Sequence, residues 1–270
     1  MHEDRVHRVV SEDGTEIAGR VHGHGPPLVL ISGTGDGEHS PFLLPMLAER
    51  FTCYSISQRG RGLSDENPDR SPDRHVEDVA AFVDSIGGPV GLAGHSRGAA
   101  IALSAAARAT SVARVAVYEP HVIEFYQDDD VARVDNARQR MANAVAEDRP
   151  ADAAAVFFED VTLPGDGELA VLSESGAFEF MAPLMPTVIQ DLVHFRPTQS
   201  SNRLPLEQIS APVLVLHGSR THPFYGDVVG QVARRLTAPQ VVELPELGHF
   251  GPLFAPEAIL AEVVPFFSAN

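Results

Sequence analysis

A serine flanked by two glycines, at a turn between an apolar strand and an alanine-rich helix, constrains the fold of this chain more than any other feature. The segment is Gly94-His95-Ser96-Arg97-Gly98, which fits the G-x-S-x-G pattern of a nucleophile elbow. A side chain that projects from so sharp a turn needs a strained backbone, and a Cβ atom two residues to either side would not fit. The pattern therefore predicts that Ser96 is a candidate nucleophile held between a strand and a helix.

Short apolar runs alternate with amphipathic helical patterns on both sides of this segment. The first two predicted strands are joined by Glu12-Asp13-Gly14, which is a hairpin turn signal. The predicted strands are residues 5–10, 16–22, 28–31, 52–57, 90–94, 112–118, 212–216 and 240–244, and the predicted helices between them are residues 41–50, 72–86, 97–109, 224–236 and a last one from about 256. This alternation predicts an α/β fold with a doubly wound, mostly parallel eight-stranded sheet and helices on both faces.

The alternation of strands and helices stops between residues 120 and 210. Helical patterns cover residues 130–147, 150–160 and 175–195, and no strand pattern occurs among them. We therefore predict a helical cap inserted after the sixth strand. The predicted domains are an α/β core of residues 1–120 and 211–270, and a cap of residues 121–210.

The candidate base for Ser96 is His249. A serine hydroxyl is a poor nucleophile at neutral pH unless a base takes its proton. His249 lies in the segment Glu246–Phe250, between the last predicted strand and the last predicted helix. Because loops at the carboxyl ends of parallel strands meet in one crevice of such a sheet, we expect His249 to lie over Ser96.

Four motifs, in this order along the chain, resemble those of the α/β-hydrolase fold superfamily. Ser32-Gly33-Thr34-Gly35 stands at the oxyanion loop, and Arg59-Gly60-Arg61-Gly62-Leu63-Ser64-Asp65 matches the family's R-G-x-G-x-S-D loop. Gly94–Gly98 matches the elbow, and Gly248-His249-Phe250 matches the terminal Gly-His. The resemblance covers almost the whole chain. It implies a capped serine hydrolase in which the N–H groups of Thr34 and Arg97 hold the oxyanion.

The chain departs from the family pattern in its loops. Ser32 replaces the usual histidine, and Ser57 replaces the aspartate that commonly precedes the R-G-x-G loop. The residues directly after Gly218 contain no carboxylate, although the family normally has its acid there. The other acid position known in the superfamily is the end of the sixth strand, where this chain has Glu119.

We predict that Glu119 is the acid that orients His249. A glutamate reaches one methylene farther than an aspartate, which suits a neighbouring strand, and Pro120 stiffens the end of that strand. Glu119 would instead be a structural residue if it only accepted backbone N–H bonds at the start of the insertion. Asp227, inside a predicted helix, is the alternative acid, and a serine–histidine dyad without an acid is the third possibility.

Three residues are candidates for binding substrate. His222 lies in the loop that normally carries the family's acid, so it is expected to line the pocket. Phe178 and Met181 belong to an apolar stripe at helical spacing within residues 178–195. Such a stripe mainly packs helices together, and part of it is expected to face the substrate.

The composition restricts the partners of this chain. Lys and Arg number 20 against 37 Asp and Glu, and the net charge of −17 argues against a nucleic acid or an anionic membrane surface as a partner. The single cysteine, Cys53, lies in an apolar run and is expected to be a buried thiol, which fits a reducing cytosol. With no apolar leader or spanning segment, a cytoplasmic location is expected. No cofactor is expected, and His22 and His24 lack partners for a metal site.

The sequence favours a hydrolase that acts on a small-molecule substrate. We expect a small or medium, mostly apolar ester, thioester or lactone, cleaved through an acyl-enzyme on Ser96. The same superfamily also contains enzymes that do not hydrolyse their substrates. A lyase, a cyclase or a cofactor-free oxygenase with His249 as base therefore stays open, as does a catalytically silent ligand-binding protein.

Overall fold

The computed structural model describes residues 5–35, 44–197 and 203–269. Its strands are β1 (Arg5–Val10), β2 (Glu16–Gly23), β3 (Pro27–Ile31), β4 (Thr52–Ile56), β5 (Val90–His95), β6 (Val112–Tyr118), β7 (Val213–Gly218) and β8 (Gln240–Leu244). They form one eight-stranded sheet in the order β1-β2-β4-β3-β5-β6-β7-β8. The pairs β1–β2 and β2–β4 are antiparallel, and the other pairs of described strands are parallel. The predicted α/β fold is confirmed.

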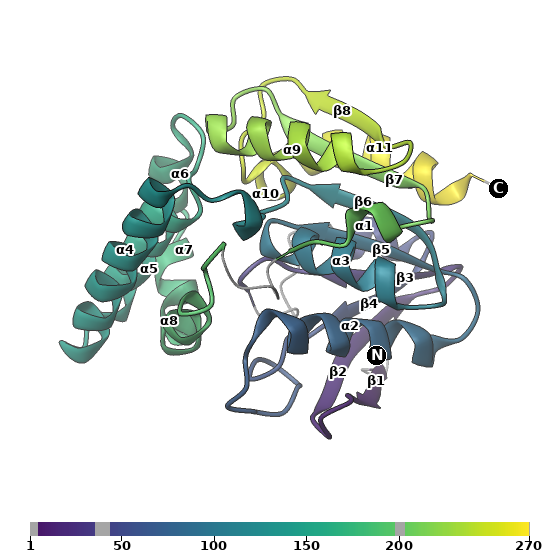
Figure 1. Cartoon of the computed structure of the whole chain (residues 1–270), viewed down its shortest axis with the longest axis horizontal. Helices are drawn as coiled ribbons and strands as arrows, with labels where there is room; N and C mark the ends of the chain where they lie inside the picture. Colours follow the sequence, from purple (N-terminus) through teal and green to yellow (C-terminus); the bar gives the residue numbers. More distant parts are fainter. Residues whose placement is uncertain (1–4, 36–43, 198–202, 270) are drawn as a thin grey trace.

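Helices cover both faces of the sheet (Figure 1). They are α1 (Leu44–Ala48), α2 (Pro72–Ile86), α3 (Arg97–Arg108), α9 (Pro223–Arg235), α10 (Gly251–Phe254) and α11 (Pro256–Ser268). Helices α2, α3 and α9 share a core with Val29 and Ile31 of β3, whereas α1 and α11 share a core with Leu28 and Leu30. Consecutive strand residues point to opposite faces, so a strand covered on both sides is apolar throughout.

Helix α3 lies against the centre of the sheet. Its residues Ala99, Ala102 and Ala105 are fully buried. Side chains this small let the helix axis approach the strands closely. The first turn of α3 is thereby fixed at the carboxyl end of β5, where Ser96 joins the two elements.

Between β6 and β7 the described residues form helices and turns only, and we call this part the helical segment. Its elements, in which η marks a 3₁₀ or π turn, are η1 (Ile123–Phe125), α4 (Asp128–Ala146), α5 (Pro150–Val156), η2 (Phe157–Val161), α6 (Glu168–Glu174), α7 (Ala177–Met181), η3 (Ala182–Leu184), α8 (Met185–Leu192) and η5 (Leu206–Gln208). Helices α4 to α8 lie together beside one end of the sheet (Figure 1). They have a hydrophobic core of their own, which includes Met141, Phe157 and Met185.

Two predicted helices differ from the structure. The pattern over residues 175–195 predicts one continuous helix, but the chain forms α7, η3 and α8 there. Pro183 lies in η3 and has no N–H to continue the hydrogen bonds of α7. The helical spacing of apolar residues continues on both sides of this break, so the spacing alone predicts one helix. The helix predicted over residues 41–50 contains α1, and residues 41–43 lie outside the described part of the chain.

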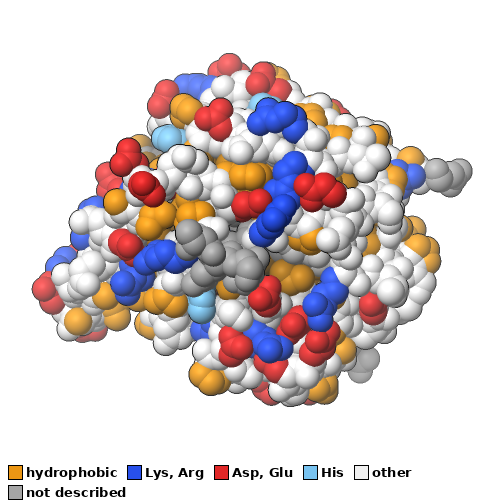
Figure 2. Space-filling view, viewed as in Figure 1, with side chains coloured by type: hydrophobic (Ala, Val, Ile, Leu, Met, Phe, Trp, Pro, Cys, Tyr) orange, Lys and Arg blue, Asp and Glu red, His pale blue; other side chains and the backbone are white. Residues whose placement is uncertain are grey.

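The surface seen in Figure 2 carries Arg side chains interspersed with Asp and Glu side chains, and apolar groups lie between them. The basic side chains on this face do not form one continuous patch. This agrees with a chain in which acidic residues outnumber basic ones. Among the described residues, no helix combines the length and the apolar character needed to cross a bilayer.

Candidate active site

Ser96 lies at the turn between β5 and α3 in a strained conformation. Its backbone has φ 55° and ψ −125°, a combination that side-chain-bearing residues seldom adopt. A Cβ atom on Gly94 would lie 2.5 Å from the carbonyl oxygen of Gly98, and one on Gly98 would lie 2.3 Å from the carbonyl oxygen of Ser32. Both glycines are therefore required by the close approach of backbone on either side of the serine.

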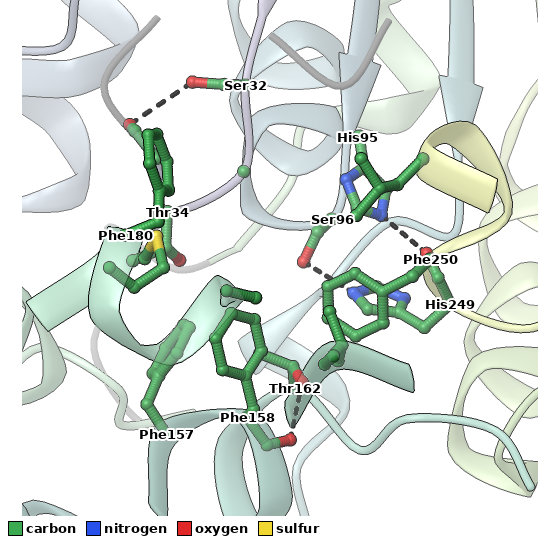
Figure 3. A pocket seen from close by; sticks show the side chains of 16 residues that line it. Ser32, Thr34, His95, Ser96, Phe157, Phe158, Thr162, Phe180, His249 and Phe250 are labelled. Atoms are coloured by element: carbon green, nitrogen blue, oxygen red, sulfur yellow. Dashed lines mark hydrogen bonds between the residues drawn. The ribbon is translucent and has the colours of Figure 1, made fainter. Parts of the chain in front are cut away.

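His249 lies over Ser96, as the sequence predicts. The imidazole Nε2 is 3.1 Å from the Oγ of Ser96, and Nδ1 is 2.9 Å from the Oε2 of Glu119 (Figure 3 shows the first of these contacts). The three side chains come from the ends of β5 and β6 and from the loop after β8. The structure thus brings together the three residues that were assigned to nucleophile, base and acid.

Glu119 follows β6 with a positive φ of 41°, which turns its side chain toward β7. Its Oε1 accepts the backbone N–H of Gly218 at 2.9 Å, and its Oε2 accepts the hydroxyl of Thr221 at 2.8 Å. Thr221 belongs to the loop in which the family normally has its acid, so that loop here supplies a donor to a carboxylate from the neighbouring strand. Asp227, the alternative acid, is exposed on α9.

Burial shifts the pKa values of both partners of this pair. It lowers the pKa of His249 to about 3, which keeps the imidazole neutral, with a lone pair available at Nε2. It raises the pKa of Glu119 to about 7, and the hydrogen bonds from Gly218 and Thr221 oppose that shift. A neutral imidazole beside a carboxylate that accepts Nδ1–H is the arrangement required of a general base.

The loop after β3 is held by Gln58, a residue that sequence reasoning missed. Its Nε2 donates to the carbonyl oxygens of Ser32 at 2.9 Å and Gly33 at 2.7 Å. In a trans peptide the C=O and the next N–H point in opposite directions, and the described residues contain no cis peptide. The N–H of Thr34 is therefore turned away from Gln58. Thr34 and Ser96 both line a common cavity.

The side chain of Arg97 does not line the cavity and instead contacts Gln58, which holds this loop. Its Nη1 donates to the Oε1 of Gln58 at 2.8 Å and to Asp191 of α8 at 3.0 Å. Burial alone would raise the pKa of Asp191, but Arg97 and Arg61 hold it below its usual range. The backbone N–H of Arg97 opens α3, where the first N–H groups have no partner within a helix. Its predicted role as an oxyanion donor fits that position.

Replacing Gln58 with glutamate is expected to lower kcat by about 10²-fold, with a small change in KM. The carboxylate keeps its pairing with Arg97 but turns an oxygen, in place of the amide N–H, toward two carbonyl oxygens, so the oxyanion loop loses its support. Steady-state kinetics on an activated ester checks this, with Gln208→Glu at an exposed site as the matched control. Equal kcat values for the two variants would show that the loop does not depend on Gln58.

The loop that carries His249 is clamped from two sides. Glu168 of α6 accepts the backbone N–H of Phe250 at 2.8 Å, and the hydroxyl of Tyr118 donates to the carbonyl oxygen of Gly248 at 2.6 Å. A Cβ atom on Gly248 would lie 2.6 Å from the Glu168 carboxyl group, so a larger residue before His249 would displace that carboxyl group. No sequence pattern pointed to Glu168, which lies in a short helix without a motif.

A cavity of about 320 Å³ opens beside Ser96, between the sheet and the helical segment (Figure 3). Its wall is mainly aromatic and aliphatic, and the described residues that line it include no Asp, Glu or Arg. The larger apolar groups are Phe157, Phe158, Leu172, Phe180, Met181, Phe250 and Leu253. Such a wall suits an apolar group attached to the atom that Ser96 attacks.

Of the three predicted substrate-binding residues, only Met181 lines this cavity. Phe178 is not in its wall and stacks on Phe158, with ring centroids 5.6 Å apart. His222 is not in its wall either, because its exposed side chain accepts the backbone N–H of Phe224 and caps α9. Phe180, which lies between Phe178 and Met181 in the sequence and was not among the predicted residues, also lines the wall.

No set of three or more His, Cys, Asp or Glu side chains within residues 5–35, 44–197 and 203–269 is arranged to hold a metal ion. Cys53 is buried in β4, as predicted. Burial raises the pKa of its thiol to about 12, so the thiolate needed for nucleophilic chemistry is not formed near neutral pH. Among the described residues that line the cavity, Ser96 is therefore the only nucleophile that has a strained backbone and a hydrogen bond to a histidine base.

A nucleophile elbow, a histidine from the last strand loop and a strand-end carboxylate on a mostly parallel sheet define the class of α/β-hydrolase-fold proteins. The profile of the "Alpha/beta hydrolase family" matches residues 28–263, and the chain belongs to this family. The resemblance seen in the four sequence motifs is thereby confirmed.

The relatives of this chain include proteins named as hydrolases and also a putative non-heme bromoperoxidase, BpoC of Mycobacterium tuberculosis, which is 27% identical over 264 residues that cover 92% of this chain and 95% of that protein. The 2-(acetamidomethylene)succinate hydrolase of Mesorhizobium japonicum is 26% identical over 265 residues, which cover 93% of this chain and 91% of that protein. An alpha/beta hydrolase from Sphaerobacter thermophilus is 30% identical, with 97% and 100% of the two chains covered and a TM-score of 0.75. The enol-lactonase from Burkholderia xenovorans LB400, 19% identical with 97% and 100% covered and a TM-score of 0.75, shares the fold.

Proposed function

We propose that this protein is a serine hydrolase that cleaves a small or medium, mostly apolar ester, thioester or lactone. The observation that carries the proposal is the continuous chain of contacts from Ser96 through His249 to Glu119, next to an apolar cavity. A serine in this setting has a base for its proton and an acid that holds the base in the right tautomer.

In the proposed mechanism, Ser96 Oγ attacks the substrate carbonyl carbon while Nε2 of His249 takes the hydroxyl proton. The N–H groups of Thr34 and Arg97 stabilise the oxyanion, and Glu119 stabilises the imidazolium. When the intermediate collapses, the bond to the leaving alcohol or thiol breaks and His249 gives that group its proton. A water molecule, deprotonated by His249, then attacks the acyl-enzyme, and release of the acid restores the Ser96 hydroxyl.

The proposed substrate class rests on the cavity wall. Its described residues carry no cationic side chain, so a substrate carboxylate would be buried there without a partner. The Mesorhizobium relative is named for a succinate derivative, and we propose that this chain prefers uncharged acyl groups instead. The helical segment, which supplies Phe158, Phe180 and Met181 to the wall, is proposed to act as the cap that selects them.

A fluorophosphonate bearing a short alkyl chain is expected to label Ser96, because the activated hydroxyl attacks phosphorus and the oxyanion donors hold the phosphoryl oxygen. Intact-protein and peptide mass spectrometry measure the adduct. Ser96→Ala should lose the label and hydrolysis of a neutral aryl ester, while Ser104→Ala, on the same helix, should keep both.

The outcome of this experiment separates the proposed hydrolase from the other chemistries of the fold. An unlabelled wild-type protein, with the same turnover in wild type and Ser96→Ala, contradicts the proposal. Turnover that survives Ser96→Ala but is lost in His249→Ala points to a reaction in which His249 alone is the base. Tight binding of an apolar ligand without turnover points to a binding protein.

A further inference from the structure

Two aromatic rings lie close to the imidazole of His249. Tyr225 of α9 stacks on it, with ring centroids 4.1 Å apart and planes 11° from parallel. The ring of His95 is tilted by 39° with its centroid 4.7 Å away, and its Nε2–H donates to the carbonyl oxygen of His249 at 2.9 Å. Tyr225 is fully buried and does not line the cavity, so it contacts the base without contacting a substrate.

The Oη of Tyr225 lies 3.2 Å from Nε2 of His249, the atom that exchanges the proton with Ser96. The same oxygen lies 2.6 Å from the carbonyl oxygen of Thr162 and 3.1 Å from Nδ1 of His121. On its far side, Nε2 of His121 is hydrogen-bonded to the hydroxyl of Tyr126. Tyr225 thus contacts the base directly and connects it to Thr162, His121 and, through His121, Tyr126.

The protons in this network have only one consistent arrangement. A carbonyl oxygen can only accept, so the single hydroxyl hydrogen of Tyr225 goes to Thr162. Burial lowers the pKa of His121 to about 3, so this imidazole is neutral and has one N–H. Nδ1 of His121 must then donate to Tyr225, and Tyr126 must donate to Nε2 of His121. The Tyr225 oxygen is left with a lone pair facing His249.

This direction matters because a phenol that donated to Nε2 would occupy the lone pair that Ser96 needs. The near-parallel stacking places the Tyr225 oxygen over the imidazole ring, so the in-plane lone pair remains directed to Ser96. A partly negative oxygen over the ring interacts weakly with a neutral imidazole and favourably with an imidazolium. The interaction is therefore stronger in the transition state than at rest, which is the condition for it to speed the reaction.

We propose that Tyr225 is a positioning residue that stabilises the imidazolium form of His249 during acyl transfer, with its hydroxyl locked by Thr162 and His121 so that it never donates to the base. This inference rests on the proposed hydrolase function. The titratable groups that face His249 or its loop are Tyr118 of β6, Glu119 directly after β6, His95 of β5, Tyr225 of α9, Glu168 of α6 and, through Tyr225, His121.

Tyr225→Phe tests the proposal, because it keeps the stacked ring and removes only the oxygen. We expect kcat to fall about tenfold with little change in KM. The group that favours protonated His249 is lost, so the pKa of the base falls and the acid limb of the kcat/KM–pH profile moves to lower pH by ~0.5–1 unit. Tyr54→Phe, a partly buried tyrosine on β4, is the control and should leave both readouts unchanged.

Tyr126→Phe is the second variant, and it keeps Tyr225 intact. Without the Tyr126 donor, Nε2 of His121 is free to carry the proton, so Nδ1 no longer donates to Tyr225. The Tyr225 hydroxyl is then less firmly locked and can turn to donate to Nε2 of His249, which favours the neutral imidazole. We expect a smaller shift of the acid limb in the same direction, which also keeps the test available if Tyr225→Phe does not fold. A purely structural role for Tyr225 would lower the thermal midpoint and leave the acid limb in place.

Labelling of Ser96 separates this inference from the proposed function. If Ser96 reacts with the fluorophosphonate in both Tyr variants but their pH profiles coincide with wild type, the role of Tyr225 is wrong and the hydrolase stands. If wild-type Ser96 does not react, the proposed function itself fails. Labelled Ser96 together with displaced acid limbs supports both.

Discussion

Replacing Glu119 with glutamine is expected to lower kcat by about 10⁴-fold, because the amide places the wrong atom against His249. The backbone N–H of Gly218 donates to Oε1, so the amide oxygen of the glutamine must occupy that position. The amide NH₂ is then left facing Nδ1 of His249 and the hydroxyl of Thr221, which can turn to accept. Nδ1 becomes an acceptor, the ring proton moves to Nε2, and the base can no longer take the proton of Ser96.

The matched control is Asp227→Asn, which removes the other acid considered from the sequence. Asp227 is exposed on α9, so this variant is expected to hydrolyse a neutral aryl ester at the wild-type rate. Steady-state kinetics of both purified variants, with circular dichroism to verify folding, provides the measurement. A Glu119→Gln variant within tenfold of wild type would remove Glu119 from the proposed triad and favour a serine–histidine dyad.

The position of Glu119 was predictable because the resemblance to the α/β-hydrolase fold implies two places for the acid, and the alternation of strands and helices locates both of them in this chain. Once the run at 212–216 is placed as the strand before Gly218, the missing carboxylate after it is visible in the sequence, and the end of β6 is the adjacent strand. What the sequence did not indicate is that Thr221 donates to Glu119 across the β6–β7 pair. A threonine in a loop has no pattern that distinguishes such a contact from exposure to solvent.

The residues that support the site were not predictable for a related reason. Gln58, Glu168 and Tyr225 act through contacts with residues far away in the chain, and none of the three belongs to a local pattern. Backbone rules identified Gly94 and Gly98 because a sharp turn imposes its demand within a few residues. Long-range partners depend on how loops from different strands meet, which periodicity does not specify.

In the helical segment, too, the sequence pattern does not specify which residues face which neighbour. Phe178 and Met181 share one apolar period, yet only Met181 reaches the cavity. Both residues lie in α7, and a hydrophobic period alone does not reveal which apolar residues face a neighbouring helix and which face a cavity. The existence of helices there was therefore easier to predict than their role.

Gly98→Ala is expected to lower kcat by about 10³-fold and to lower the thermal midpoint, although it adds a single methyl group. The new Cβ would lie 2.3 Å from the carbonyl oxygen of Ser32 and 2.4 Å from that of Ile31. These are backbone atoms at the end of β3, so relief of the clash must move either the start of α3 or the oxyanion loop. Both proposed oxyanion donors, Arg97 and Thr34, lie on these two segments.

The matched control is Gly226→Ala, which adds the same methyl group to an exposed glycine of α9 with no heavy atom within 4 Å of the new Cβ. Alanine favours the helix, so this variant should be as active as wild type and more stable by ~0.5–1 kcal/mol. Steady-state kinetics and thermal unfolding of the two variants separate the effect of each glycine on kcat from its effect on stability. If Gly98→Ala lost stability but kept kcat, the close approach at Gly98 would serve only packing. A loss of kcat well beyond the loss of stability would show that the contact between α3 and the end of β3 sets the spacing of the two oxyanion donors.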